Sequence, residues 1–130
     1  MKDKYYYSDG STSSEIDYSK QLHRVDGPAI EYPNGHKAWY LNGKLHRIDG
    51  PAIEWADGTK WWYLNGRHHR IDGPAREWSN GSKDWFLNGE RYTEEEFNNT
   101  IKEVNEMCLS LLLTDTREWV RELGRKRSKE

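Results

Sequence analysis

Hydrophobic and polar positions recur in a fixed order over most of the chain, with a period of 23 residues. Three contiguous blocks align without gaps over residues 22–44, 45–67 and 68–90, and 13 of their 23 columns are identical. In every block a polar segment beginning with histidine precedes two short apolar stretches, each followed by a turn dipeptide. A period of this length indicates a repeat architecture in which one block is one small structural unit.

Each block contains two dipeptides that favour hairpin turns, one in its middle and one near its end. The dipeptides are Asn-Gly or Asp-Gly at 34–35, 57–58 and 80–81, then Asn-Gly at 42–43, 65–66 and 88–89. Both sequences suit a two-residue loop, because both of its central positions need positive φ. We therefore expect each block to be one hairpin that leads into another, with Ile30 opposite Trp39 in the first.

Alternation along the strands then separates two faces. The expected core face carries Pro28, Ile30, Tyr32, Trp39 and Leu41 and their equivalents in the later blocks. The opposite face mixes small, acidic and aromatic residues, and its aromatic members are Tyr40, Trp61, Tyr63 and Phe86. A single hairpin is marginally stable in water, so the blocks should stack on one another.

The two ends of the chain depart from the repeat. Residues 1–21 are interpreted as a degenerate half-repeat that caps one end, because Tyr5 to Gly10 matches the middle of a block. Residues 22–92 hold the three repeats, and residues 93–130 are expected to form a helical cap with a basic tail at 125–130.

The helical cap is predicted from its start signal and its apolar spacing. Thr93 and Glu96 fit a capping box. One stripe at helical spacing follows, made of Phe97, Ile101, Val104, Cys108, Leu111 and Leu112. A second short helix is expected to carry Trp119, Val120 and Leu123 and to stop at Gly124.

These patterns predict a mainly β fold with C-terminal α structure. It should be an elongated antiparallel array of stacked β-hairpin repeats, capped by one or two helices. The apolar stripe needs a surface to cover, and the open end of the array beside Trp78, Trp85 and Leu87 provides one.

Composition narrows the class of protein. Apolar residues make up only 34%, yet the chain has seven Trp and eight Tyr, which is unlike a disordered chain. The net charge of −2 gives no overall field that would attract nucleic acid or an anionic membrane. One cysteine excludes an intrachain disulfide, and the chain shows neither a signal sequence nor an apolar run of membrane-spanning length, so we expect a cytoplasmic protein.

The repeated segment His46-Arg47-Ile48-Asp49-Gly50-Pro51-Ala52, with Trp62-Tyr63-Leu64-Asn65-Gly66, resembles the MORN-like hairpin repeats of bacteriophages and large DNA viruses. The resemblance covers about residues 22–97 and implies a hairpin array used as a binding or scaffolding surface. It further implies a phage protein that acts on a host component, in the host cytoplasm. A typical MORN repeat has a Gly-x-Gly pair where this chain has Asp49-Gly50-Pro51, so the lipid association of that family is not carried over.

The repeated His, Arg and Asp residues could suggest a hydrolase, but three equivalent copies favour a structural role. Catalysis needs one preorganised site with distinct roles. A zinc site needs three or four converging ligands, whereas His23, His46 and His69 are each a whole block apart. We expect arginine and aspartate to pair across the Asp-Gly-Pro turn and histidine to bond the backbone, with no catalytic residue, metal or cofactor.

The expected binding strip combines exposed aromatic rings with arginines, residue types that anchor many protein interfaces. Its members are Tyr40, Trp61, Tyr63, Phe86, Arg24, Arg47 and Arg70. The favoured function is a non-enzymatic module that binds and inhibits or modulates a host protein, for instance a nuclease of a defence system. Nucleic acid or anionic lipid remains an alternative ligand, a hydrolase is a remote one, and a homodimer through the C-terminal stripe stays open.

Overall fold

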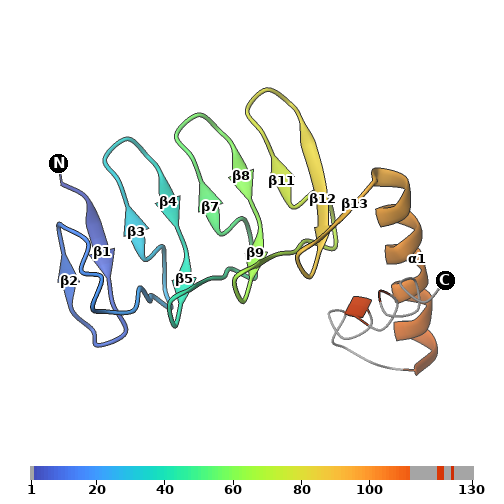
Figure 1. The fold of residues 1–130 in the computed structure, drawn as a ribbon, viewed down its shortest axis with the longest axis horizontal. Coiled ribbons are helices and arrows are strands. Elements are labelled where there is room, and N and C mark those ends of the chain that lie inside the picture. The colour runs from blue at the N-terminus through green and yellow to red at the C-terminus, as the bar shows by residue number, and fades with distance from the viewer. Residues whose placement is uncertain (1, 112–119, 122–123, 125–130) are drawn as a thin grey trace.

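The protein is described by a computed structural model over residues 2–111, 120–121 and 124. Figure 1 shows an elongated row of hairpins that ends on one helix. The strands are β1 (Lys4–Tyr6), β2 (Thr12–Ser13), β3 (Ile30–Glu31), β4 (Lys37–Ala38), β5 (Tyr40–Leu41), β6 (Lys44–Leu45), β7 (Ile53–Glu54), β8 (Lys60–Trp61), β9 (Tyr63–Leu64), β10 (Arg67–His68), β11 (Arg76–Glu77), β12 (Lys83–Leu87) and β13 (Glu90–Tyr92), and the helix is α1 (Glu94–Leu111).

Nine strands form one antiparallel sheet in the order β13-β12-β11-β8-β7-β4-β3-β1-β2. The second hairpins of the first two blocks, β5-β6 and β9-β10, are separate two-stranded sheets. Successive blocks therefore lie side by side, each contributing two strands to the large sheet (Figure 1). The predicted mainly β array with a C-terminal helix is confirmed.

Opposite charges alternate straight across the large sheet. In the observed register each glutamate lies between two lysines of neighbouring strands, one of its own block and one of the preceding block or of β1. The row is Lys4, Glu31, Lys37, Glu54, Lys60, Glu77 and Lys83. Opposite charges in facing positions stabilise a pair of strands by about 0.2–1 kcal/mol each. The row thus supports the stacking of one block on the next.

The predicted two-residue loop at the first turn is wrong, whereas that at the second turn is confirmed. Ile30 pairs with Ala38, not with Trp39. In this first loop only Gly35 has positive φ, at 98°, and the Tyr32 N–H donates to the His36 carbonyl at 2.9 Å, which leaves three residues in the loop. At the second turn Asn42 and Gly43 both have positive φ, 51° and 78°, as a two-residue loop requires.

This shift of one residue changes the faces, because the side-chain period of a strand is two. Ile30 shares its face with Ala38, so the expected core face that joined Ile30 to Trp39 is wrong. The alanines at 29, 52 and 75, placed on the opposite face by the sequence, are fully buried. Each is a contact point between blocks: the Trp39 N–H donates to the Ala52 carbonyl of the next block at 2.7 Å.

Two hydrophobic clusters lie at the two ends of the array. The N-terminal cluster contains Tyr5, Tyr7, Ile30 and Ala38, and Tyr5 on β1 pairs directly with Ile30. Residues interpreted as a half-repeat thus form β1 and β2 and extend the sheet.

The C-terminal cluster joins the helix to the last block. Phe97 and Val104 of α1 are buried against Leu87, with Trp85 and Ile101 packed beside them. The predicted capping box is present, since the Glu96 N–H donates to Thr93 Oγ1 at 3.1 Å and the Thr93 N–H donates to Glu96 Oε1 at 3.2 Å. The helix therefore covers the open end of the array, as expected.

The remaining helical predictions fall partly outside the described residues. The side chains of Cys108 and Leu111 lie outside them, as do Leu112, Trp119, Leu123 and the basic tail. Residues 120, 121 and 124 are helical, and the residues on either side of Gly124 lie outside the described part, so the predicted stop at Gly124 stays a prediction. Val120 is buried in the C-terminal cluster.

Candidate functional site

The three repeated histidines support the second turn of each block. The Nδ1 atom of His23 accepts the Asn42 N–H at 2.9 Å, and the same bond recurs at 3.0 Å from Asn65 to His46 and from Asn88 to His69. The asparagine is the left-handed residue of the Asn-Gly turn in every case. The expected histidine-to-backbone bond is therefore present, and it fixes a strained turn.

The three repeated arginines make the same set of contacts in every block. The Arg47 Nε donates to Asp49 at 3.1 Å, and its Nη1 donates to the Pro51 carbonyl at 3.1 Å. Its guanidinium lies 3.8 Å from the centre of the Trp39 ring, a cation–π contact. Arg24 lies in the same way over Tyr6, and Arg70 over Trp62, at 3.9 and 3.8 Å. The expected pairing of arginine with aspartate across the turn is present.

The glycine of the Asp-Gly-Pro turn leaves room for this stack. A Cβ atom at Gly50 would lie 3.1 Å from Arg47 Cζ, and the equivalent distance at Gly73 is 2.9 Å. The motif Arg-x-Asp-Gly-Pro is thus a packing unit that holds one guanidinium flat on an aromatic ring. The arginine side chains are consequently only 18–25% exposed, whereas those of Asp26 and Asp49 are 85% exposed.

The predicted aromatic residues Trp61, Tyr63 and Phe86 gather around one histidine of the third block. His68 lies 3.9 Å from the Tyr63 ring and 4.9 Å from the Phe86 ring, centre to centre. Arg76 covers Trp61 and Phe86 and donates from Nε to His68 Nε2 at 3.1 Å. Burial, followed by the charge of Arg76, lowers the pKa of His68 to about 4.

Within the predicted strip, the aromatic rings and the repeated arginines take part in different contacts. Trp61 and Trp62 are neighbours on the chain. The guanidinium of Arg76 lies over the Trp61 ring, whereas that of Arg70 lies over the Trp62 ring. The aromatic cluster around His68 and the arginine stacks are therefore separate groups of contacts. Tyr40 is half-buried against the N-terminal cluster, where burial raises the pKa of its hydroxyl.

The residues that the sequence reasoning missed lie at the outer corner of each block. Val25, Ile48 and Ile71 follow the repeated arginine, and they are 84%, 87% and 41% exposed. We call these three residues the corner row. The sequence does contain a signal for the corner row, because a β-branched apolar residue occurs three times in an otherwise polar turn segment.

A groove lies between the corners of the second and third blocks. It has a volume of about 560 Å³, within the range of ligand pockets. We call it the corner groove, and its main lining residues are Ile48, Asp49, Trp62, Leu64, Ile71 and Asp72. Arg47 and Arg70 also line it, so two of the predicted binding residues belong to this site. The groove thus has apolar walls with two arginine–aspartate pairs beside them.

Over the described part of the chain, no group of three His, Cys, Asp or Glu side chains has the arrangement of a metal site. None of the helices described there has the length and apolarity needed to cross a bilayer.

Comparison with known proteins gave no match: no family model, no curated protein and no solved structure matches the chain. The resemblance to MORN-like repeats therefore stays a prediction that rests on the motif residues. The structure is compatible with a repeat, because equivalent residues of the three blocks make equivalent contacts.

Proposed function

We propose that this chain is a non-enzymatic protein-binding module whose corner groove receives a helix of the partner. The observation that carries the proposal is the corner row with its groove: large aliphatic side chains that a folded domain normally buries stand exposed at the same place in three blocks. Repeated exposed apolar groups of this kind mark interaction sites.

The spacing of the corner row fits a helical partner. Equivalent corners are two strands apart in the sheet, which corresponds to about 9.6 Å. Residues seven apart on an α-helix are separated by about 10.5 Å along its axis. A helix with apolar side chains at every seventh position can therefore contact Val25, Ile48 and Ile71 in turn.

The charge around the corners favours basic residues on that helix. Asp26, Asp49 and Asp72 follow the three corner residues, and their side chains are 79–85% exposed. Each is paired on one side with the arginine of its own block, which leaves its solvent-facing side for a lysine or arginine of the partner.

The resemblance to repeats of bacteriophages and large DNA viruses supports a host protein as the partner, and we place the encounter in the host cytoplasm. The chain would inhibit or modulate that partner by occupying one of its helices; a nuclease of a defence system is one such target. A homodimer through α1 would need a different face of the helix, because Phe97, Ile101 and Val104 already pack on the last block.

The test uses two synthetic helical peptides of the same composition. One has leucines at every seventh position flanked by lysines, and the other has the same residues in scrambled order. Fluorescence anisotropy measures binding to the wild-type protein, to Ile48→Ser and to the control Tyr18→Ser, since Ile48 and Tyr18 are both 87% exposed.

We expect the seven-spaced peptide to bind the wild-type protein and Tyr18→Ser equally, and Ile48→Ser about tenfold more weakly. Equal binding of the scrambled peptide, or an unchanged affinity of Ile48→Ser, would show that the corner row is not the site. A host protein that is retained by the wild type and Tyr18→Ser but lost by Ile48→Ser would then identify the partner.

A further inference from the structure

A second groove lies beside the second turns of the three blocks and is lined by cations from three separate parts of the chain. Lys44 on β6 follows the turn Asn42-Gly43, Arg67 on β10 follows the turn Asn65-Gly66, and Arg121 belongs to the segment after α1. The groove has a volume of about 410 Å³, and Leu64, Asn65 and Asn88 complete its lining. We call it the cationic groove.

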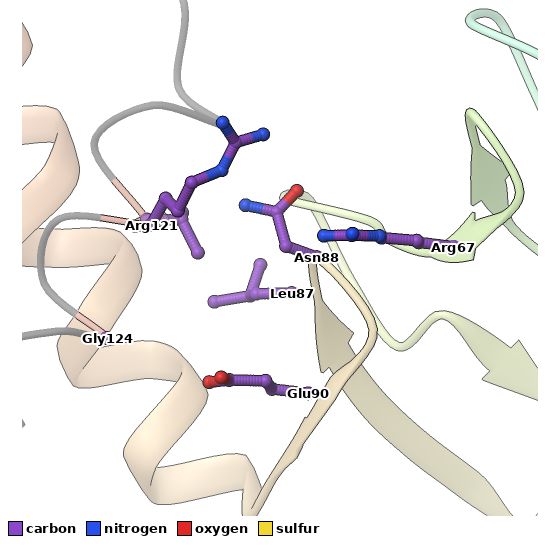
Figure 2. A pocket seen from close by; sticks show the side chains of 7 residues that line it. Arg67, Leu87, Asn88, Glu90, Arg121 and Gly124 are labelled. Carbon is purple, nitrogen blue, oxygen red and sulfur yellow. The ribbon is translucent and has the colours of Figure 1, made fainter. Parts of the chain in front are cut away.

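The two arginines point toward the same space. Figure 2 shows the guanidinium groups of Arg67 and Arg121 on either side of the Asn88 side chain. The carboxylate of Glu90 lies beyond Leu87 in this view, on the side of the helix. Among the residues that the structure describes, neither arginine forms an ion pair, and neither does Lys44.

The backbone of the turns holds two of these cations in place. A Cβ atom at Gly66 would lie 3.8 Å from Lys44 Cβ, and one at Gly89 would lie 3.7 Å from Arg67 Cβ. Each long side chain therefore runs over the glycine of the following turn, which directs its charge toward the next block. Two turns and the C-terminal segment converge on the groove in this way.

The positive charge is particular to this part of the array and is not a property of the repeat. Lys44 and Arg67 occupy the last position of the first and second blocks. The equivalent position holds Gln21 before the first block and Glu90 in the third block. The chain as a whole has a net charge of −2. Three cations without a described counter-charge repel each other, and an anion with several acceptor oxygens would relieve that repulsion.

We propose that the cationic groove binds a phosphate group, either as free phosphate or on a phosphorylated side chain. Arginine guanidinium groups match the oxygens of phosphate with two parallel N–H donors, and lysine adds a point charge. The side-chain amide of Asn65 can donate to one of the remaining oxygens. This site is distinct from the corner groove, although Leu64 lines both.

The test is a titration of the full chain with inorganic phosphate and, separately, with phosphoserine, followed by ¹H–¹⁵N NMR at constant ionic strength. The reporters are the backbone and side-chain amides of Asn65 and Asn88. The variants Arg67→Gln and Lys44→Gln introduce the residue that Gln21 already places in the same column, so the turns should still fold. Lys2→Gln removes the same charge at the far end of the array and is the control.

We expect saturable shifts at Asn65 and Asn88 in the wild type and in Lys2→Gln, with affinity reduced about tenfold or more in Arg67→Gln, since a charged hydrogen bond is lost. Tighter binding of phosphoserine would assign a phosphorylated side chain, and equal or tighter binding of inorganic phosphate would assign the free ion. Shifts that do not saturate, or an affinity that is the same in Arg67→Gln and Lys2→Gln, would overturn the proposal. These outcomes are independent of Ile48, so they leave the proposed protein-binding function untouched.

Discussion

Replacing His68 by leucine should remove its share of the stability that is lost as the pH falls from about 7 to about 5. Leucine is the residue that the first two blocks place in this column, as Leu22 and Leu45. The third block differs from them at two linked positions, because Arg76 replaces the isoleucine of that column and donates to His68 Nε2. The pair His68 and Arg76 thus occupies the place of the apolar pair Leu45 and Ile53.

The sign and size of the effect follow from the pKa of His68, which is lowered from 6.5 to about 4. The unfolded chain binds this proton at pH values at which the folded chain does not, so the free energy of unfolding falls as the pH drops through 6.5 and levels off below about 4. A fully buried ring would lose about 1.4 kcal/mol per pH unit in this window. Because solvent screens the half-buried ring, we expect a loss of about 1 kcal/mol between about pH 7 and about pH 5.

The assay is urea unfolding of the wild type and His68→Leu at several pH values. The difference between their pH slopes isolates His68, because the burial that lowers the pKa of His36 is the same in both proteins. The double variant His68→Leu/Arg76→Ile restores the pair of the second block and controls for an arginine left without its acceptor. If His68→Leu lost stability with acid as steeply as the wild type, the buried neutral histidine would not be the cause.

Three further changes test the packing. Gly50→Ala should lower the free energy of unfolding in urea by about 1–3 kcal/mol, because the new Cβ meets the Arg47 guanidinium. In an Arg47→Ala background this loss should largely disappear. If the losses of the two single variants simply added in the double variant, the clash would be contradicted. Leu87→Ala, at a fully buried position of the C-terminal cluster, should cost about 2–5 kcal/mol, and a cost near zero would mean that the helix does not pack there. Thr93→Ala should cost about 1 kcal/mol in thermal unfolding by removing the cap of α1, whereas Thr93→Ser should not.

Much of the fold could be predicted because each block repeats the same local signals. The second turn, the capping box and the helical stripe depend on neighbouring residues. The first two are present, as is the described part of the stripe, Phe97, Ile101 and Val104. The first turn could not be read from its dipeptide, since Asn34-Gly35 and Asn42-Gly43 are identical in sequence. They differ in their contacts: the Asn34 side chain accepts the His36 N–H, whereas the Asn42 N–H is held by His23 from 19 residues away.

The candidate site was harder to predict because it depends on contacts between blocks. The pairing of Arg47 with Asp49 is local and was expected, but the stack of Arg47 on Trp39 joins two blocks and withdraws the arginine from solvent. Residue type alone places Ile48 inside a protein, whereas the structure leaves it exposed at a corner. The stack of Arg47 on Trp39 can be predicted only when the packing of one block on the next is known. The exposure of Ile48 is the opposite of what its hydrophobicity predicts.

The way in which the array ends has a consequence for its length. Thr93 stands 23 residues after Arg70, at the position that holds the repeated arginine in each block. Trp85 therefore packs with the cluster that contains α1, whereas Trp39 and Trp62 are each covered by an arginine. An additional block would bring its own arginine, its own tryptophan and one more glutamate and lysine for the charged row. Such proteins can therefore grow or shrink by whole blocks while both ends stay the same, and their reach along a partner would change in steps of about 10 Å.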